Sequence, residues 1–276
     1  MLYVTSRSIE VPALGFGTYQ LKDAIAREMV RAALDIGFRH IDTAQLYDNE
    51  KDVGLALRAS GIERHELFLT TKVWSDRFAW GDLQRSVEES LDRLGLESID
   101  LLLLHWPNPH IPLEETLRAL AEVQENGWAR QIGVSNFNTA LLEQVESLIP
   151  ERIISNQVEY HPLLKQRSVL DWVQEHQIMM TAYSPLAQGK IIHHPVIKQI
   201  AARHGKNPGQ IALRWLLQQA QVTAIPRSSS IEHARDNFNI FDFQIDADEM
   251  EKISSLGSPN GRLLNLPGYA PQWDAE

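Results

Sequence analysis

The stretch Leu101-Leu102-Leu103-Leu104-His105 decides how this chain folds. Four apolar residues in a row predict a strand buried on both faces, as in a parallel sheet that is covered by helices. The run ends in an imidazole, and two earlier runs, Phe38–Asp42 and Leu67–Lys72, also end in an ionisable side chain. The sequence therefore predicts parallel strands that each present a polar group at the carboxyl end.

Short runs of this β type occur eight times, with amphipathic helical patterns between them. From Asp42 to Gln157 the strand ends are 30, 33, 30 and 22 residues apart, which are the lengths of strand-plus-helix units. Eight such units predict an α/β fold, a single closed (β/α)₈ TIM barrel over residues 1–276. The predicted strands are Leu14–Thr18, Phe38–Asp42, Leu67–Lys72, Ile99–His105, Gln131–Ser135, Ile153–Gln157, Met179–Ser184 and Val222–Ile225.

Three segments lie outside this repeat. We expect a short N-terminal hairpin over the bottom of the barrel before Leu14. Between Ser184 and Val222 there is room for an extra helix, and Pro208 suggests where it begins. The tail from Ser258 to Glu276 is rich in proline and glycine, so we expect it to be irregular.

Composition excludes several classes of protein. A net charge of −10 disfavours nucleic-acid binding, which requires a concentrated basic face. The absence of cysteine excludes disulfides, zinc thiolate sites and thiol nucleophiles, and it fits a reducing cytosol. The N-terminus has no signal-peptide core, and no apolar run approaches the roughly 18 residues of a membrane span. We expect a cytoplasmic monomer without nucleic-acid or membrane partners.

Polar side chains stand at the carboxyl end of every predicted strand. One lysine or histidine at such a place is usually a solvated charge or a hydrogen-bonded core residue. Eight positions on the same barrel face instead predict an active site, because barrel enzymes build theirs there. They are Thr18, Asp42, Lys72, His105, Ser135 with Asn136, Gln157, Tyr183 with Ser184, and the Pro226-Arg227-Ser228 corner.

Four residues form a coherent chemical set. A free tyrosine is a poor acid near neutral pH, and a neighbouring ammonium lowers its pKa. Lys72 can supply that charge to Tyr47, with Asp42 as its counter-ion, and His105 can orient a carbonyl oxygen. This set protonates a carbonyl but has no hydride, so a nicotinamide cofactor is implied.

A second group of residues suits that cofactor. Gly15-Phe16-Gly17-Thr18 is only half of a dinucleotide-binding glycine motif, so a Rossmann domain is not supported. Arg227 and the serines after it open a helical pattern that reaches Asn237, where a phosphate could bind. A helix cap with a surface arginine is an alternative that explains this segment equally well. Tyr183 could stack on a flat ring, or it could be a core aromatic residue at the rim.

These motifs, taken in order, resemble the aldo-keto reductases. The resemblance extends from Leu14 to the tail and includes the stretch Gly37–Gly54, with Glu50 as a structural member of the signature. It implies NADPH-dependent reduction of aldehydes and ketones to alcohols by hydride transfer. It makes Asp42, Tyr47, Lys72 and His105 the catalytic tetrad, with Tyr47 as the proton donor. The cofactor-binding residues that it implies are Gly17, Thr18, Asp42, Ser135, Asn136, Gln157, Tyr183, Ser184, Leu186, Arg227, Ser228, Ser229, His233 and Asn237.

One position departs from the family pattern. Six residues after Arg227 the family often has an arginine for the 2′-phosphate of NADPH, and here the residue is His233. Histidine is mostly neutral at pH 7, so we expect a looser grip, with NADPH preferred and some use of NADH.

By family position the substrate pocket is lined by aromatic and apolar residues around one polar corner. Within the family the chain is most similar to the B-type bacterial diketogluconate reductases, which also reduce methylglyoxal. Short loops at Asn108–Pro112 and Ala187–Pro195 predict an open pocket for small polar carbonyls such as diketogluconate, methylglyoxal or β-keto esters. Packing at the rim is the alternative role for the tryptophans. The predicted lining residues are Tyr19, Leu46, Trp74, His105 and Trp106.

Two other functions fit the sequence less well. A non-catalytic barrel subunit that senses nicotinamide nucleotides would have a damaged tetrad or an added partner-binding segment, and the sequence shows neither. A metal-dependent hydrolase would bring metal ligands together. The adjacent His193 and His194 do not converge with other ligands, so we expect no metal site.

Overall fold

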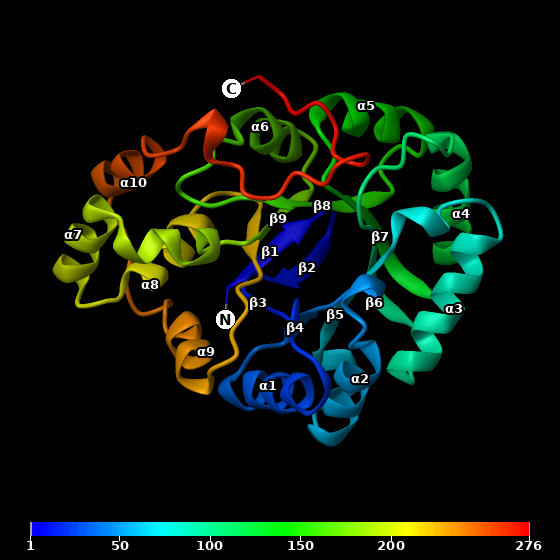
Figure 1. The fold of residues 1–276 in the computed structure, drawn as a ribbon, viewed down its shortest axis with the longest axis horizontal. Coiled ribbons are helices and arrows are strands. Elements are labelled where there is room, and N and C mark those ends of the chain that lie inside the picture. Colours follow the sequence, from blue (N-terminus) through cyan, green and yellow to red (C-terminus); the bar gives the residue numbers. More distant parts are fainter. Residues whose placement is uncertain (1, 276) are drawn as a thin grey trace.

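A computed structural model of the chain describes residues 2–275. At its centre eight parallel strands pair in chain order, and bridges from Leu14 to Ala224 and from Gly17 to Arg227 close the sheet (Figure 1). The closed sheet with its helices confirms the predicted (β/α)₈ barrel. The strands are β3 (Gly15–Gly17), β4 (His40–Asp42), β5 (Phe68–Val73), β6 (Ile99–Leu104), β7 (Ala129–Ser135), β8 (Ile153–Glu159), β9 (Met179–Tyr183) and β10 (Val222–Ala224).

Helices surround the sheet, each with its apolar stripe turned inward. In the helix Asp82–Leu94, for example, Leu83, Val87 and Leu91 are buried, and charged residues occupy the outer face. The helices are α1 (Asp23–Ile36), α2 (Glu50–Ala59), α3 (Asp82–Leu94), α4 (Leu113–Glu125), α5 (Thr139–Leu148), α6 (Arg167–Glu175), α7 (Pro195–His204), α8 (Pro208–Leu217), α9 (Ile231–Phe238) and α10 (Ala247–Ser254). Short 3₁₀ turns lie at η1 (Gln45–Tyr47), η2 (Arg64–Glu66), η3 (Ser75–Arg77), η4 (Ala187–His193) and η5 (Pro259–Gly261).

The glycine at position 54 sets how closely α2 approaches α3. A Cβ atom at Gly54 would overlap the carbonyl oxygen of Leu94, at the last residue of α3. Only a residue without a side chain fits there. The close contact fixes α2, and with it the turn η1 that leads into the helix from the barrel mouth.

An antiparallel hairpin, β1 (Tyr3–Ser6) and β2 (Ile9–Pro12), covers one end of the barrel. The Ser6 hydroxyl donates a hydrogen bond of 2.6 Å to the Ile154 carbonyl oxygen, and the Arg7 amide donates to the carbonyl oxygen of Gln177. Both acceptors lie at the amino ends of strands. The predicted hairpin is therefore confirmed at the bottom, and the carboxyl ends of the strands form the other face.

Two helices, not one, fill the segment between β9 and β10. Pro208 begins α8, as predicted, with Asn207 as its N-cap. Pro195, the last residue of the predicted short loop Ala187–Pro195, likewise begins α7, a second helix that the sequence interpretation did not predict. Apart from η5, the described part of the tail has no regular structure, as expected, and it passes across the barrel beside α5 and α6 (Figure 1). None of the helices in residues 2–275 is both long and apolar enough to cross a bilayer.

Candidate active site

A buried ion pair stands where β4 and β5 end. Lys72 has an exposed fraction of 0%, and its Nζ lies 2.6 Å from Asp42 Oδ1 and 2.8 Å from the Thr43 carbonyl oxygen. Burial lowers the pKa of the Lys72 ammonium, and the carboxylate of Asp42 opposes that change. The two oxygens thus replace the water that the ammonium has lost.

The phenol of Tyr47 reaches the same ammonium. Tyr47 is the last residue of η1, and Asp48 after it adopts a left-handed conformation with φ 50°. The Oη atom of Tyr47 lies 3.4 Å from Lys72 Nζ, and the ammonium lies 4.9 Å from the centre of the Tyr47 ring. The turn that follows β4 therefore folds Tyr47 back over the ion pair.

The expected lowering of the Tyr47 pKa is not found. Burial raises the pKa of the Tyr47 hydroxyl well above its ordinary value, and the charge of Asp42 raises it further. The Lys72 ammonium is held closer to Asp42 and Thr43 than to the phenol, so its charge is largely compensated. Tyr47 is therefore protonated at neutral pH, which is the form that a proton donor requires.

His105 stands directly after β6, between two aromatic rings. Its ring centre lies 5.6 Å from that of Tyr47 and 5.4 Å from that of Trp74, both in edge-to-face geometry. Burial, aided by the charge of Lys72, lowers the pKa of His105 well below its usual value. Its Nδ1 atom is buried without a hydrogen-bond partner among the described residues. We therefore assign the neutral tautomer with the proton on Nε2, since a buried unpaired N–H would be costly.

Ser135, Asn136 and Gln157, which are predicted to bind the cofactor, form one hydrogen-bonded chain with the ion pair. Gln157 Nε2 donates a hydrogen bond of 2.8 Å to Asp42 Oδ2, and the Ser135 hydroxyl donates to the carbonyl oxygen of Gln157. Asn136 has φ 64° and donates to the carbonyl oxygen of His105. The hydroxyl of Tyr183 donates to Asn136 Oδ1 over 2.8 Å. The structure therefore brings these residues together, although their roles stay predictions.

The remaining predicted cofactor residues border this group. Thr18 donates from both its amide and its hydroxyl to the Asp42 carbonyl oxygen, and the Gly17 amide donates to that of Pro226. Ser184 has a left-handed φ of 48°, and Leu186 directly precedes η4 and is half-buried. These contacts fix the backbone at the barrel rim.

The predicted phosphate corner lies at the start of α9. Arg227 is exposed, and its Nε donates to the Tyr19 carbonyl oxygen. The hydroxyl of Ser228 is engaged within its own turn, where it donates to the carbonyl oxygen of Ser230 and accepts from the amide of that residue. Ser230 caps α9, a role that the sequence interpretation did not assign to it. A helix cap and an exposed arginine that could bind phosphate are thus both present at this corner.

The other three predicted residues near this corner differ in their position relative to α9. Ser229 precedes the helix and is exposed, and His233 is an exposed residue of the first turn. Asn237 is buried in the last turn, away from the helix N-terminus. A phosphate at the N-terminus of α9 would therefore lie near Ser229 and His233, and Asn237 would contact another part of the cofactor.

The predicted substrate pocket is only partly open. Tyr19 and Leu46 are 50% and 52% exposed, Trp74 is half-buried, and Trp106 is only 7% exposed. The sequence interpretation missed Tyr269, whose ring lies 5.7 Å from that of Trp74 and whose hydroxyl contacts Asp76. The tail thus adds a wall to the site. No periodic pattern in the sequence predicted the position of Tyr269, because the tail has no regular structure.

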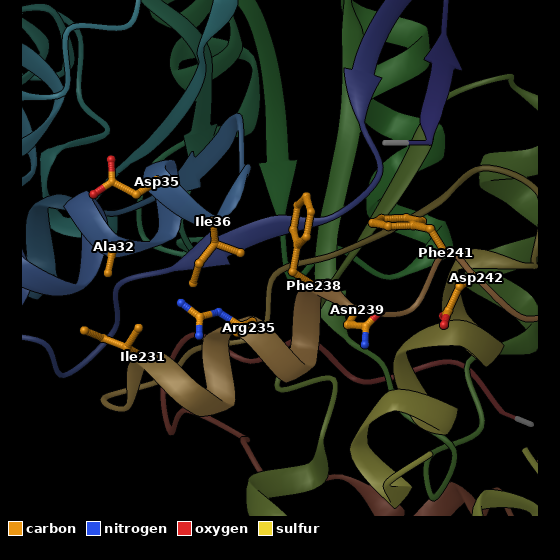
Figure 2. A pocket seen from close by; sticks show the side chains of 9 residues that line it. All are labelled: Ala32, Asp35, Ile36, Ile231, Arg235, Phe238, Asn239, Phe241 and Asp242. Atoms are coloured by element: carbon orange, nitrogen blue, oxygen red, sulfur yellow. The ribbon is translucent and has the colours of Figure 1, made fainter. Parts of the chain in front are cut away.

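A separate surface cavity does not involve these residues. It has a volume of about 790 Å³ and lies between α1 and α9 (Figure 2). Ile36 and Phe238 face it from the two helices, with Arg235 beside them. The cavity contains none of the predicted site residues. Among residues 2–275 no cluster of histidine, cysteine and acidic side chains could hold a metal ion.

Known proteins identify the class of enzyme that this site defines. The profile of the Aldo/keto reductase family matches residues 13–258. The chain belongs to this family of NADPH-dependent oxidoreductases, as its motifs indicated. It is 41% identical to methylglyoxal reductase DkgB of Escherichia coli O157:H7, over 96% of this chain and 99% of the relative.

Solved structures agree with the family assignment. One that is provisionally described as a 2,5-diketo-D-gluconic acid reductase B is 44% identical, has a TM-score of 0.97, and the match covers 99% of this chain and 97% of that one. A Gox0644 mutant in complex with NADPH is 32% identical, has a TM-score of 0.90, and the match covers 95% of this chain and 96% of the other. The fold is therefore shared with a protein that binds NADPH.

Proposed function

We propose that this enzyme reduces small polar aldehydes and ketones to alcohols with NADPH, and that Tyr47 is the proton donor. The observation that carries the proposal is the position of the Tyr47 hydroxyl, 3.4 Å from the buried Lys72 ammonium and beside the ring of His105. Bound NADPH supplies a hydride to the carbonyl carbon. The chain's own residues bind the carbonyl oxygen and deliver the proton.

Each residue of the set has a separate task. The Tyr47 hydroxyl donates its proton to the substrate oxygen, and Lys72 stabilises the phenolate that remains. Asp42 keeps the ammonium charged and in place over 2.6 Å. His105 is neutral, so its N–H donates a hydrogen bond to the same oxygen without competing as an acid.

The residues present fit a nicotinamide nucleotide. Amide side chains of Asn136 and Gln157 stand at the barrel mouth, where they would hold the carboxamide, and the ring of Tyr183 is fixed by its bond to Asn136. Arg227 uses only Nε in a hydrogen bond among the described residues, and so its other nitrogens can bind phosphate beside the N-terminus of α9. His233 in place of a second arginine supports some use of NADH.

The substrate class follows from the pocket and from the relatives. Aromatic walls from Trp74 and Tyr19 surround one polar corner at Tyr47 and His105. Methylglyoxal and diketogluconate, which the relatives' names mention, are small polar carbonyl compounds of the kind that fits. Oxidation of NADPH should be measured against methylglyoxal, diketogluconate, a β-keto ester and an aromatic aldehyde. Absence of turnover with all four would contradict the proposal.

The alternative, a non-catalytic nucleotide-sensing subunit, is not favoured by any observation, because all four tetrad residues converge. From the sequence we also propose that the protein acts as a monomer in the cytoplasm. Light scattering at micromolar concentration tests the first part, and a mass of two chains would contradict it.

A further inference from the structure

One buried carboxylate outside the tetrad holds the C-terminal tail. Glu159, the last residue of β8, has an exposed fraction of 0%. Its Oε1 accepts the Leu263 amide at 2.7 Å, and its Oε2 accepts the Leu264 amide at 2.9 Å. The tail is thus tied to the barrel by two backbone amides on a single anion.

His161 completes the set of donors to Glu159. Its Nδ1 accepts a hydrogen bond from the Leu163 amide, so the ring proton is on Nε2. Nε2 then donates to Glu159 Oε1 over 3.0 Å. Three N–H donors thus occupy the two oxygens of the buried carboxylate. A carboxylic acid or an amide at this position could not accept from all three.

The tail follows a close path before it reaches Glu159. Ser258 pairs with the loop after β8, where its carbonyl oxygen accepts from the Lys165 amide and its own amide donates to the Leu163 carbonyl oxygen. A Cβ atom at Gly261 would overlap that same Leu163 oxygen. The first part of the tail therefore lies close against this loop, and the contact at Gly261 leaves no room for a side chain.

Glu159 also stands beside the proposed nicotinamide platform. It is the register partner of Tyr183 on the neighbouring strand β9. Burial raises the pKa of the Tyr183 hydroxyl. The charge of Glu159 raises this pKa further, and the charge of Arg262 in the tail lowers it. Farther along, Tyr269 forms the pocket wall against Trp74. One anion thus connects the platform with the tail.

We propose that Glu159 is a positioning residue that couples cofactor binding to the closure of the tail over the pocket. This inference rests on the proposed function. A cofactor that stacks on Tyr183 fixes the strand edge that carries Glu159, and so it stabilises the tail on its two amides. By reciprocity, a seated tail tightens cofactor binding by the same factor.

Trypsin tests this coupling, because Arg262 is the only lysine or arginine after Lys252. Cleavage at Arg262 releases residues 263–276 and is followed by mass spectrometry with and without saturating NADPH. We expect NADPH to slow cleavage of the native chain at least about fivefold. In Glu159→Gln the amide nitrogen faces a tail amide, so cleavage should accelerate about tenfold, and NADPH should protect less than about twofold.

Two further variants complete the experiment. Gly261→Ala forces the tail from its path on the loop after β8 while it leaves every barrel residue unchanged in sequence, so it should lose the protection in the same way even if Glu159→Gln does not fold. The control, Asp274→Asn, removes one of the two oxygens that accept hydrogen bonds from Thr139, far from Glu159, and should keep the protection. Equal cleavage of the native chain with and without bound NADPH would overturn the inference. Failure to bind NADPH, measured by quenching of tryptophan fluorescence, would overturn the proposed function itself.

Discussion

At the scale of single residues, the proposed mechanism divides the tasks of holding and delivering a proton among the four residues of the tetrad. Burial disfavours the charged forms of Tyr47, Lys72 and His105, so Tyr47 stays a phenol and His105 stays neutral. Lys72 remains the one cation because Asp42 and the Thr43 carbonyl oxygen surround it. The site is therefore set with one transferable proton on Tyr47.

Replacing Tyr47 by phenylalanine should remove the proton donor and little else. We expect kcat for carbonyl reduction to fall about 10²–10⁴-fold, the usual contribution of a general acid. The dissociation constant for NADPH should stay within about twofold, since the ring is retained. The control is Tyr3→Phe, which removes the hydroxyl of an exposed tyrosine in the hairpin at the other end of the barrel. Substantial turnover in Tyr47→Phe would show that the proton has another source.

Position 233 should set the choice between the two nicotinamide cofactors. His233→Arg places a permanent charge on the first turn of α9, close to the proposed phosphate site. We expect the ratio of kcat/KM for NADPH over NADH to rise about tenfold, which corresponds to one charge-assisted hydrogen bond. His65→Arg adds the same charge in η2 and should leave the ratio unchanged. An unchanged ratio in His233→Arg would place the 2′-phosphate elsewhere.

His105 should also make stability depend on pH. Its pKa in the folded chain lies well below the ordinary 6.5, so the unfolded chain binds more protons as the pH falls below 6.5. The free energy of unfolding therefore decreases with falling pH, by up to about 1.4 kcal/mol per pH unit for this group. Denaturant titrations at pH 7.5 and 5.5 should show a smaller loss in His105→Gln, and the same loss as wild type in the exposed control His110→Gln. Equal losses in all three proteins would contradict the assignment.

At the scale of elements, the contact between α2 and α3 holds the turn that carries Tyr47. Gly54→Ala places a Cβ atom on the Leu94 carbonyl oxygen, a backbone atom that cannot move aside without shifting α3. We expect unfolding in denaturant to become easier by about 2–3 kcal/mol. In Gly209→Ala, on α8, the nearest atoms are side-chain atoms at 3.3 and 3.6 Å, so the change should stay within about 1 kcal/mol. Similar losses in both variants would argue against the close contact.

The elements also show how far sequence alone reaches. Strands such as Leu101–Leu104 could be predicted because burial on both faces leaves a continuous apolar run, and the polar residues at their ends include Asp42, Lys72 and His105. The contacts of Tyr269 and Leu263 in the tail could not be predicted, since both residues lie in a segment without periodicity. Their positions depend on partners more than 100 residues away, such as Glu159. The prediction that Lys72 lowers the Tyr47 pKa was also wrong. Burial raises this pKa, and the charge of Lys72 is already compensated by its own partners.

At the scale of the whole molecule, the two ends of the barrel have different tasks. The hairpin β1–β2 covers the bottom, where no predicted site residue lies, and the tail and the loops after the strands build the other face. Barrel enzymes commonly separate stability from chemistry in this way. Two buried serines, one at each end, donate similar hydrogen bonds to backbone carbonyl oxygens and so allow a matched comparison.

Ser6 donates to the Ile154 carbonyl oxygen at 2.6 Å below the barrel, and Ser75 donates to that of Trp106 at 2.8 Å at the mouth. Each change to alanine leaves one buried carbonyl unpaired, so both variants should lose about 1–3 kcal/mol of unfolding free energy. Only Ser75→Ala should also raise the substrate KM, because it frees the loop beside Trp74 and His105. Stability is measured by denaturant titration and KM by NADPH oxidation. A rise in KM in Ser6→Ala equal to that in Ser75→Ala would show that the two ends are coupled, because damage at the bottom would then reach the pocket.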